Sequence, residues 1–334
     1  MKKLLALCVI SSLLLLGLSG CNDEKKDVKI GVSLGVGGAS RWAKDKQLME
    51  DKAKELGIEI EVRLNITDEP LTQKEDCIEL IDSGIDVLIL TPRDVRKADD
   101  IVKYAKEHGV KVISYSRPVM GQEVDLYVGY DSTKIGQYMG KFLSETVDKG
   151  NYIILKGDIN DFNTRLLDAG AMMYLDNIKD DINIILYDNV PNWDANIAKE
   201  MVRNAIINNN YKIDAILAPN DKIAEVCADV IKELGITNEV AITGMDAEVN
   251  ALKRINNGKQ SMTVYLSLDQ LAETAINQAY NMAIGKDFTS NALFDNDTKN
   301  KISAFLVSGQ LITKENMKAQ IIDKEIYTEA QVYE

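Results

Sequence analysis

Residues 28–45 read VKIGVSLGVGGASRWAKD, and this stretch indicates the fold class of the whole chain. Val28–Leu34 is a short apolar run rich in β-branched residues, as is typical of a buried strand. The glycine-rich segment Gly35–Ala39 predicts a loop. Ser40 is a residue type that commonly caps a helix, and we expect that helix to run to about Leu56. The stretch therefore predicts a strand, a loop and a helix, which together form one unit of an α/β fold.

Strands and helices alternate along most of the remaining chain. We expect strands at 59–63, 86–90, 111–114, 126–129, 152–155, 183–187, 215–217, 240–243, 261–266 and 301–307. Helices are expected between them at 71–82, 95–107, 133–148, 164–178, 195–208, 222–234, 248–255 and 268–284. Such alternation is typical of parallel sheets with helices on both faces. Because the units form two consecutive series and 334 residues exceed a typical single domain, the sequence predicts two lobes.

The residues that follow the first strand have the chemistry of a ligand site. In open α/β sheets, ligands bind outside the carboxyl ends of the strands, where Arg41 and Trp42 are expected. A guanidinium group donates hydrogen bonds to oxygens, and an indole offers a flat apolar face with one donor. Together they suit a ligand that is polar at its rim and apolar on its faces, as a sugar ring is. The alternative is that Trp42 packs on the sheet and Arg41 is only solvated.

The N-terminus predicts export and anchoring. Lys2-Lys3 precedes an apolar run, Leu4–Leu18, that is too short to span a membrane as a helix. The run ends in Leu18-Ser19-Gly20-Cys21, which resembles the lipobox of bacterial lipoproteins at every position. The resemblance implies a signal peptide at 1–20, lipidation of Cys21 and a tether at 21–27, the alternative being an uncleaved anchor. Either way, we expect the body of the protein on the outer face of a membrane.

Charge and cysteine content restrict the classes of partner. The net charge of −13 argues against nucleic acid and anionic lipid as partners. Cys77 and Cys227 each lie inside a helical pattern. A secreted scaffold held together by disulfides would need more cysteines, so we expect two buried free thiols.

Several segments carry a resemblance over residues 28–310 to the type I periplasmic sugar-binding proteins. In order, they are Arg41–Asp45, Asp86–Ile89, Tyr115–Arg117, Gly129–Asp131, Gly170–Met172, Asn209–Ala215, Asn220-Asp221, Gly244–Ala247 and Met262–Tyr265. The resemblance implies two similar doubly wound parallel-sheet lobes joined by a three-strand hinge. It also implies crossings near Asp131, Tyr265 and Asn300, with 28–131 plus 266–299 in the N-terminal lobe and 132–265 plus 300–334 in the C-terminal lobe.

The resemblance further implies a binding site for a monosaccharide, an aldopentose such as D-xylose first. Its residues would be Arg41, Trp42, Ser116 and Arg117 from the first lobe and Asp161, Asn163, Trp193, Asn220 and Asp246 from the second. The family pattern has an aspartate where this chain has Ser116 and a lysine where it has Leu266, which puts the sugar's identity in doubt. Asn220 and Asp246 have an alternative interpretation as helix N-caps.

An enzyme is not expected. The one histidine, His108, lies near a predicted helix end, and neither cysteine has a histidine partner in the sequence pattern. Residues 35–40 resemble a dinucleotide-binding G-x-G-x-x-G motif, but Ser40 breaks its last position. Residues 158–163 resemble a calcium loop, but Phe162 occupies a ligand position and the glycine is missing. The sequence therefore predicts neither a cofactor nor a metal.

The resemblance leaves two membrane partners open. In one, the sugar-bound form docks on an ABC permease and delivers sugar. In the other, it docks on a membrane receptor such as a histidine kinase and reports sugar. No residue in the sequence discriminates between delivery and sensing, because both use the same ligand chemistry and the same hinge motion.

Overall fold

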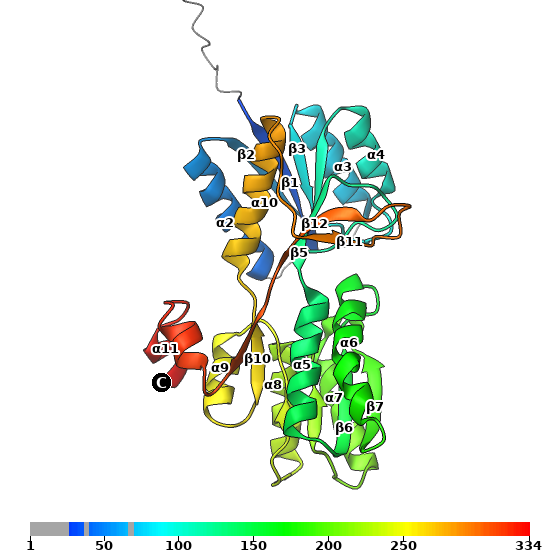
Figure 1. Cartoon of the computed structure of the whole chain (residues 1–334), viewed down its shortest axis with the longest axis vertical. Helices are drawn as coiled ribbons and strands as arrows, with labels where there is room; N and C mark the ends of the chain where they lie inside the picture. Colours follow the sequence, from blue (N-terminus) through cyan, green and yellow to red (C-terminus); the bar gives the residue numbers. More distant parts are fainter. Residues whose placement is uncertain (1–26, 37–39, 66–69) are drawn as a thin grey trace, which may run out of the picture.

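The computed structural model describes residues 27–36, 40–65 and 70–334, which form two lobes (Figure 1). The first lobe is built on a seven-stranded sheet of order β11-β12-β5-β4-β3-β1-β2. Its strands are β1 (Lys29–Val36), β2 (Glu59–Asn65), β3 (Val87–Leu90), β4 (Lys111–Tyr115), β5 (Leu126–Tyr130), β11 (Ala292–Phe294) and β12 (Ile302–Val307). All neighbours pair in parallel except β11 and β12, which are antiparallel.

Helices cover both faces of this first sheet. They are α2 (Ser40–Leu56) and α10 (Leu268–Ala283) on one face, and α3 (Pro70–Asp82) and α4 (Asp99–Glu107) on the other (Figure 1). The central strand β3 is buried throughout, as expected for a strand covered on both sides. The helix predicted from Val95 begins at Asp99 instead, because the carbonyl of Val95 accepts a hydrogen bond from the Met120 amide and the preceding turn is thereby held apart from the helix.

The second lobe has a smaller sheet, which is parallel throughout, of order β7-β6-β8-β9. Its strands are β6 (Gly150–Lys156), β7 (Ile182–Asn189), β8 (Ala215–Leu217) and β9 (Ala241–Ile242). Its helices are α5 (Ser132–Thr146), α6 (Phe162–Leu175), α7 (Ala195–Asn208), α8 (Asp221–Glu233) and α9 (Val249–Asn256), with short 3₁₀ turns at Asp176–Ile178 and Pro191–Trp193. The two parallel-sheet lobes predicted from the alternation of elements are confirmed.

Three stretches of chain connect the lobes. The first runs from β5 into α5 at Asp131, whose side chain caps α5 by accepting a hydrogen bond from the Lys134 amide. The others are associated with β10 (Met262–Tyr265) and β13 (Gln310–Thr313), which pair antiparallel with each other. Because β12 pairs with β5, residues 302–307 belong to the first sheet, and the third crossing follows Val307 rather than lying near Asn300 as the resemblance implied.

The C-terminal stretch packs on the second lobe. It contains a π-helical turn, Lys318–Ile322, and the short helix α11 (Glu329–Tyr333). Its buried apolar residues form one cluster with α9 and β13, made up of Ala247, Leu252, Ile255, Ile312, Met317, Ile321 and Val332. The mixture of charged and apolar residues at the end of the sequence therefore reflects a segment with one buried face.

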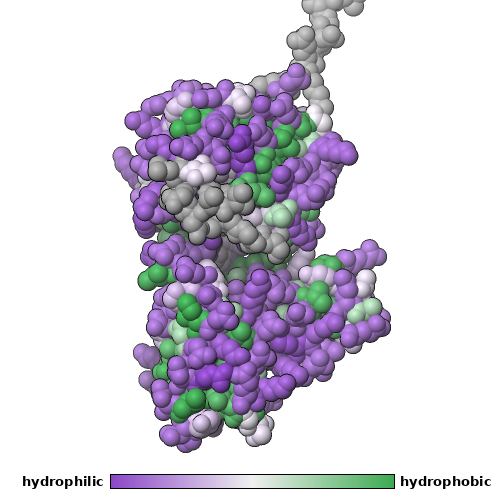
Figure 2. All heavy atoms as spheres, turned by 180° about the vertical axis from the view of Figure 1, so that it is seen from behind, coloured by the Kyte–Doolittle hydropathy of each residue, from purple (hydrophilic) through white to green (hydrophobic). Residues whose placement is uncertain are grey.

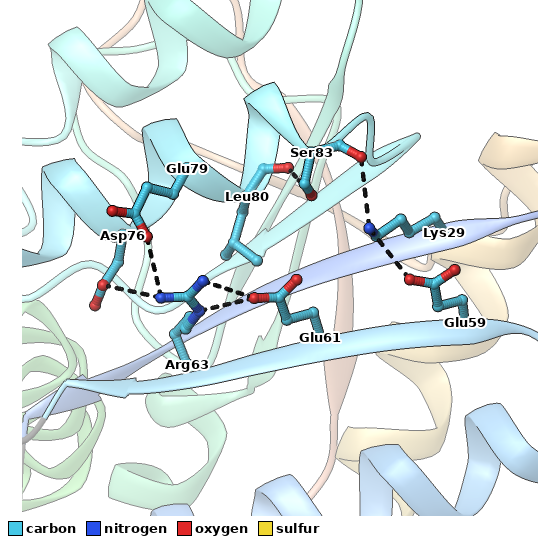
Figure 3. A network of polar contacts seen from close by, with 8 residues as sticks. All are labelled: Lys29, Glu59, Glu61, Arg63, Asp76, Glu79, Leu80 and Ser83. Carbon is cyan, nitrogen blue, oxygen red and sulfur yellow. Dashed lines mark hydrogen bonds and ion pairs between the residues drawn. The ribbon is translucent and has the colours of Figure 1, made fainter.

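Charged side chains cover the exposed edge of the first sheet, at β2. Figure 3 shows Arg63 of β2 between Glu61 on the same strand and two acidic residues of α3, with Nη1 lying 3.2 Å from Glu79 and 3.6 Å from Asp76. Its Nε and Nη2 both donate hydrogen bonds to Glu61. Charges on an edge strand discourage pairing with other chains, and these contacts also attach α3 to the sheet.

The thiols of Cys77 and Cys227 are buried and free, as the sequence predicted. Cys77 lies on α3 and Cys227 on α8, and both side chains are fully buried. Burial raises the pKa of each thiol to about 12, so both stay protonated and unreactive near neutral pH.

Close packing of α5 against α6 depends on glycine. A methyl group added at Gly136 would overlap the Leu167 carbonyl oxygen, and one at Gly140 would overlap that of Ala171. Gly170 on α6 faces the Thr133 carbonyl in the same way. The two helix backbones therefore approach each other more closely than any side chain at these positions would allow.

We predict that Gly136→Ala lowers the free energy of unfolding, by about 1–3 kcal/mol for an overpacked site. The sign is informative, because helix propensity alone would make alanine more stable than glycine by about 1 kcal/mol. Urea denaturation followed by circular dichroism measures the change. Glu145→Ala, at an exposed position of the same helix, serves as the control and should be close to neutral. A Gly136→Ala protein as stable as the parent would contradict the close approach.

Candidate functional site

The candidate site residues follow the carboxyl ends of strands in both sheets. In the second lobe, Asp161 and Asn163 follow β6, Trp193 follows β7, Asn220 follows β8 and Asp246 follows β9. In the first lobe, Arg41 and Trp42 follow β1, and Ser116 and Arg117 follow β4. Parallel pairing brings the carboxyl ends of neighbouring strands to one edge, where open α/β sheets bind ligands. Both sheets therefore present these residues at the edge where sheets of this kind bind ligands.

Arg41 and Trp42 form a stacked pair at the start of α2. The guanidinium carbon of Arg41 lies 4.7 Å from the centroid of the Trp42 ring. Nη2 of Arg41 donates a hydrogen bond of 2.7 Å to the Ser116 hydroxyl. Trp42 is only 8% exposed, and its ring packs against Gly35, where a methyl group would lie 3.3 Å from the indole. Trp42 thus belongs largely to the core, whereas Arg41 remains partly accessible.

Ser116 contacts both lobes. Its backbone adopts the left-handed region, with φ of 62°. While its hydroxyl accepts from Arg41, its carbonyl accepts hydrogen bonds from the Tyr127 hydroxyl at 3.3 Å and from Nδ2 of Asn163 at 3.2 Å. Because Asn163 belongs to the second lobe, this carbonyl is a direct link across the interface between the lobes.

The start of α6 provides further contacts between the lobes. Asp161 caps α6 by accepting a hydrogen bond from the Asn163 amide, and its other oxygen lies 3.8 Å from Nη2 of Arg117. Between these two residues, Phe162 meets Phe294 of β11 edge to face, with ring centroids 5.8 Å apart. Three consecutive residues of the second lobe therefore contact the first lobe through an ion pair, an aromatic contact and a hydrogen bond.

Trp193 is held in an unusual backbone conformation. Both Asn192 and Trp193 have positive φ, 55° and 57°. A methyl group added at Gly157 would overlap the Trp193 ring, so the indole lies directly on the glycine that follows β6. The ring is half-buried, and it contacts apolar clusters on both faces of the second sheet.

Asn220 and Asp246 differ in how the structure uses them. Asn220 is the N-cap of α8, with its side-chain oxygen accepting from the Ile223 amide at 2.9 Å, so that alternative is confirmed. Asp246 does not cap α9, whose N-cap is Glu248. Its backbone has φ of 102°, its amide donates to the Val264 carbonyl, and its side chain is exposed.

The electrostatics of Asp246 connect it with Arg41. Desolvation raises the pKa of Asp246 to about 6, and the positive charge of Arg41, from the opposite lobe, acts against that rise. Figure 2 shows a recess between the two lobes. The charge of Arg41 on the first lobe thus acts on Asp246 of the second lobe.

Asp221 is a residue whose burial the sequence did not reveal. Its carboxylate is fully buried and accepts hydrogen bonds from Nε2 of Gln260, the Thr263 hydroxyl and the Glu248 amide, each at 2.8–3.0 Å. Burial raises its pKa to about 8, and these donors act against the rise. Because the Asp221 amide also donates to the Met245 carbonyl, this carboxylate fixes the loop that carries Asp246. The only signal in the sequence was its place beside Asn220.

Within the described residues, no cluster of His, Cys, Asp and Glu could hold a metal ion. In the same ranges, no helix has the length and apolar character needed to span a membrane. The predicted signal peptide, the lipidated Cys21 and most of the tether lie outside the described residues.

Comparison with known proteins decides the family. Residues 30–287 match the family model described as periplasmic binding protein domain. The chain belongs to this family. The chain is also 32% identical to the D-xylose-binding periplasmic protein of Escherichia coli (strain K12), with 98% of each chain covered. The D-xylose-binding periplasmic protein of Haemophilus influenzae is 30% identical over 93% of each chain.

Solved structures agree with this assignment. A carbohydrate transporter solute binding protein from Chloroflexus aurantiacus, in complex with D-glucose, superimposes with a TM-score of 0.82 at 28% identity. The match covers 90% of this chain and 97% of that one. The predicted type I periplasmic binding protein fold is thereby confirmed, as is the prediction that the chain is a binding protein and not an enzyme. Membership of the family places the chain outside the cytoplasm.

We predict that Arg41→Ala raises the pKa of Asp246 above about 6. Arg41 is the first of the charges that lower this pKa, so its removal leaves desolvation less opposed. Carbon-13 NMR of protein labelled at aspartate Cγ measures the titration, and Asp246→Asn identifies the resonance. Arg96→Ala, which removes an exposed arginine paired with Asp297, is the control. An unchanged or lower pKa in Arg41→Ala would show that the two side chains do not face each other.

Proposed function

We propose that this protein binds a monosaccharide between its lobes, an aldopentose with D-xylose first, and closes on it for delivery to an ABC sugar permease. The observation that carries the proposal is the arrangement of hydrogen-bonding and aromatic side chains at the carboxyl ends of parallel strands in both sheets. The D-xylose-binding relatives and the D-glucose complex support the same class of ligand.

The residue types suit the hydroxyl groups of a sugar. Carboxylates such as Asp246 accept hydrogen bonds, guanidinium groups such as Arg41 donate them, and the amide of Asn220 does both. The cap formed by Asn220 uses its side-chain oxygen and not its NH2 group. The half-buried Trp193 offers a flat apolar surface to the face of a sugar ring.

Some of the proposed ligand residues already have partners in the structure. Asn163 uses its side-chain oxygen to accept from the Ser132 hydroxyl and its NH2 group to reach the Ser116 carbonyl. Asp161 caps a helix and faces Arg117. To bind Asn163 and Asp161, a sugar would therefore have to replace their present partners. Arg41 and Asp246 would bind it from opposite sides of the recess.

The identity of the sugar depends on Ser116 and Leu266. Ser116 is a neutral acceptor for Arg41, in place of the aspartate of the family pattern. Leu266 is only 9% exposed and packs in the core that both lobes share, in place of the lysine. With one anion and one cation fewer around the ligand, another pentose or a hexose is the main alternative to D-xylose.

Delivery is the role we propose for the bound form, with the body anchored at the membrane by a lipid on Cys21. The relative of known structure is described as a carbohydrate transporter solute binding protein, which supports a permease as the partner. Reporting to a membrane histidine kinase would use the same site and the same closure.

We predict that isothermal titration calorimetry detects binding of at least one sugar among D-xylose, D-ribose, L-arabinose, D-glucose and D-galactose. Because each proposed hydrogen-bonding residue contributes to affinity, Asp246→Asn should weaken that binding by roughly ten-fold or more, as expected for a hydrogen bond to a charged group worth about 1.5–3 kcal/mol. The exposed Arg96→Ala variant serves as the control and should bind as the parent does. Absence of heat from all five sugars at millimolar concentration would contradict the proposal.

We also predict that the bound sugar draws the lobes together. The proposed ligand residues come from both lobes, so the sugar finds all its partners only when the lobes approach, and a ligand biases such an equilibrium through its differential affinity. Small-angle X-ray scattering should give a smaller radius of gyration at saturating sugar. Identical scattering curves with and without sugar, at a concentration that calorimetry shows to be saturating, would rule out closure as the signal to a membrane partner.

A further inference from the structure

Asp45 lies directly behind Arg41 and is sealed from solvent. It follows Arg41 by one turn of α2, and its side chain is 0% exposed. Its Oδ2 atom lies 3.5 Å from Nε of Arg41, which is an ion pair longer than a hydrogen bond. A buried carboxylate is costly unless it is paired, so its presence here calls for a role.

The contacts of Asp45 and Arg41 form a closed circuit with β4. The hydroxyl of Tyr115, a fully buried residue at the end of β4, donates a hydrogen bond to Oδ1 of Asp45. Nη2 of Arg41 donates to the hydroxyl of the next residue, Ser116. The pair on α2 is therefore attached at both ends to consecutive residues of one strand end, while the guanidinium stacks on Trp42.

We propose that Asp45 is the positioning residue of the site: with Tyr115 as its anchor, it holds the Arg41 guanidinium in the orientation that meets the ligand. This role for Asp45 depends on the proposed function in one respect only, namely that the ligand is a sugar. Asp45 cannot contact a ligand itself, because its side chain has no exposed surface, whereas that of Arg41 is partly exposed.

The charges around the pair agree with this role. Burial raises the pKa of Asp45, while Arg41 and the hydrogen bond from Tyr115 act against the rise. Burial likewise disfavours the charged form of Arg41. The negative charge of Asp45 is the largest of the effects that outweigh burial, so the pKa of Arg41 is raised. Each group thus favours the charged form of the other. Among the described residues, Nε of Arg41 and Oδ2 of Asp45 have no hydrogen-bond partner, so their contact orients the guanidinium by charge.

A double-mutant cycle tests whether Asp45 acts through Arg41. The variants are Asp45→Asn, Arg41→Ala and the two combined, with D-xylose as the probe and D-glucose, D-ribose, L-arabinose and D-galactose as further arms, all by calorimetry. Asp45→Asn should weaken binding of the sugar that the parent binds at least ten-fold. In the Arg41→Ala background the same change should alter affinity less than two-fold, because residues that act as one unit are not additive. An equal loss in both backgrounds would overturn the proposal.

A second measurement needs no sugar. In protein labelled with ¹⁵N-arginine, the Nε–H signal of Arg41 is identified by its loss in Arg41→Ala. Asp45→Asn should shift this signal and speed its exchange with water, and Tyr115→Phe should have a smaller effect in the same direction. An Arg41 signal unchanged in both variants would overturn the proposal, whatever the calorimetry gives. If the parent binds none of the sugars, the proposed function fails while this measurement still decides the role of Asp45.

Asp125→Asn is the matched control for Asp45→Asn. Asp125 precedes β5 in the same lobe and accepts hydrogen bonds from the Val112 amide and from Lys111, with no contact to Arg41 among those of the described residues. Asp125→Asn should leave the sugar affinity and the Arg41 signal unchanged. Tyr115→Phe provides the second variant if Asp45→Asn does not fold, because it keeps the buried ring and removes only the anchoring hydroxyl. An Arg41 signal that shifts equally in Asp125→Asn would show a general effect of acid removal and count against the proposal.

Discussion

Parallel strand pairing is the constraint on which the candidate site depends. In a parallel sheet every strand ends at the same edge, so the residues after β6, β7, β8 and β9 meet although they are far apart in sequence. The first sheet does the same for the residues after β1 and β4, which is why α2 and β4 can share the circuit of Arg41, Asp45, Tyr115 and Ser116. Had the second sheet been antiparallel, the residues after β6 would lie at the opposite edge from those after its neighbours β7 and β8.

The strands that connect the lobes set how the two edges face each other. β5 leads directly into α5, and the antiparallel pair β10 and β13 contributes the remaining connections. Asp221 links this pair to the site, because it accepts from Thr263 of β10 and from the Glu248 amide beyond the loop that holds Asp246. A movement of β10 would therefore displace the loop of Asp246, because the buried Asp221 carboxylate connects the two. In this way the hinge and the ligand edge of the second lobe share a single polar network.

Much of the fold was accessible from sequence, because apolar strands and glycine-terminated helices give strong local signals. β8 and α7 lie where periodicity predicted them. β11 and β13 were missed because they are only three and four residues long, and because their pairing partners are other parts of the chain that local pattern cannot reveal. The third crossing was misplaced for the same reason, since only the pairing of β12 with β5 shows where it lies.

The candidate site was predicted less completely than the fold. Resemblance gave the side chains at the strand ends, but it could not show which of them already have partners, as Asn163 does with Ser132 and the Ser116 carbonyl. Nor could it show that Asp45 and Asp221 are buried, because an acidic residue in a helix is usually exposed. Burial is a property of tertiary packing, and the sequence around these two acids contains no local trace of it.

Charge balance in the recess bears on the class of ligand. Arg41 is matched by Asp45 behind it, and Arg117 lies near Asp161, so the two cations already have anions close by. Desolvation raises the pKa of Asp246 in spite of Arg41. An anionic ligand would bring another negative charge close to Asp246, and a cationic one would compete with Arg41 for its carboxylates. A neutral ligand with many hydroxyl groups can instead donate to Asp246 and accept from Arg41 without disturbing either pair. The substitution of a neutral serine for an acid at position 116 fits this balance, since Asp45 is the first of the negative charges that stabilise the charged form of Arg41 and Asp246 adds to it.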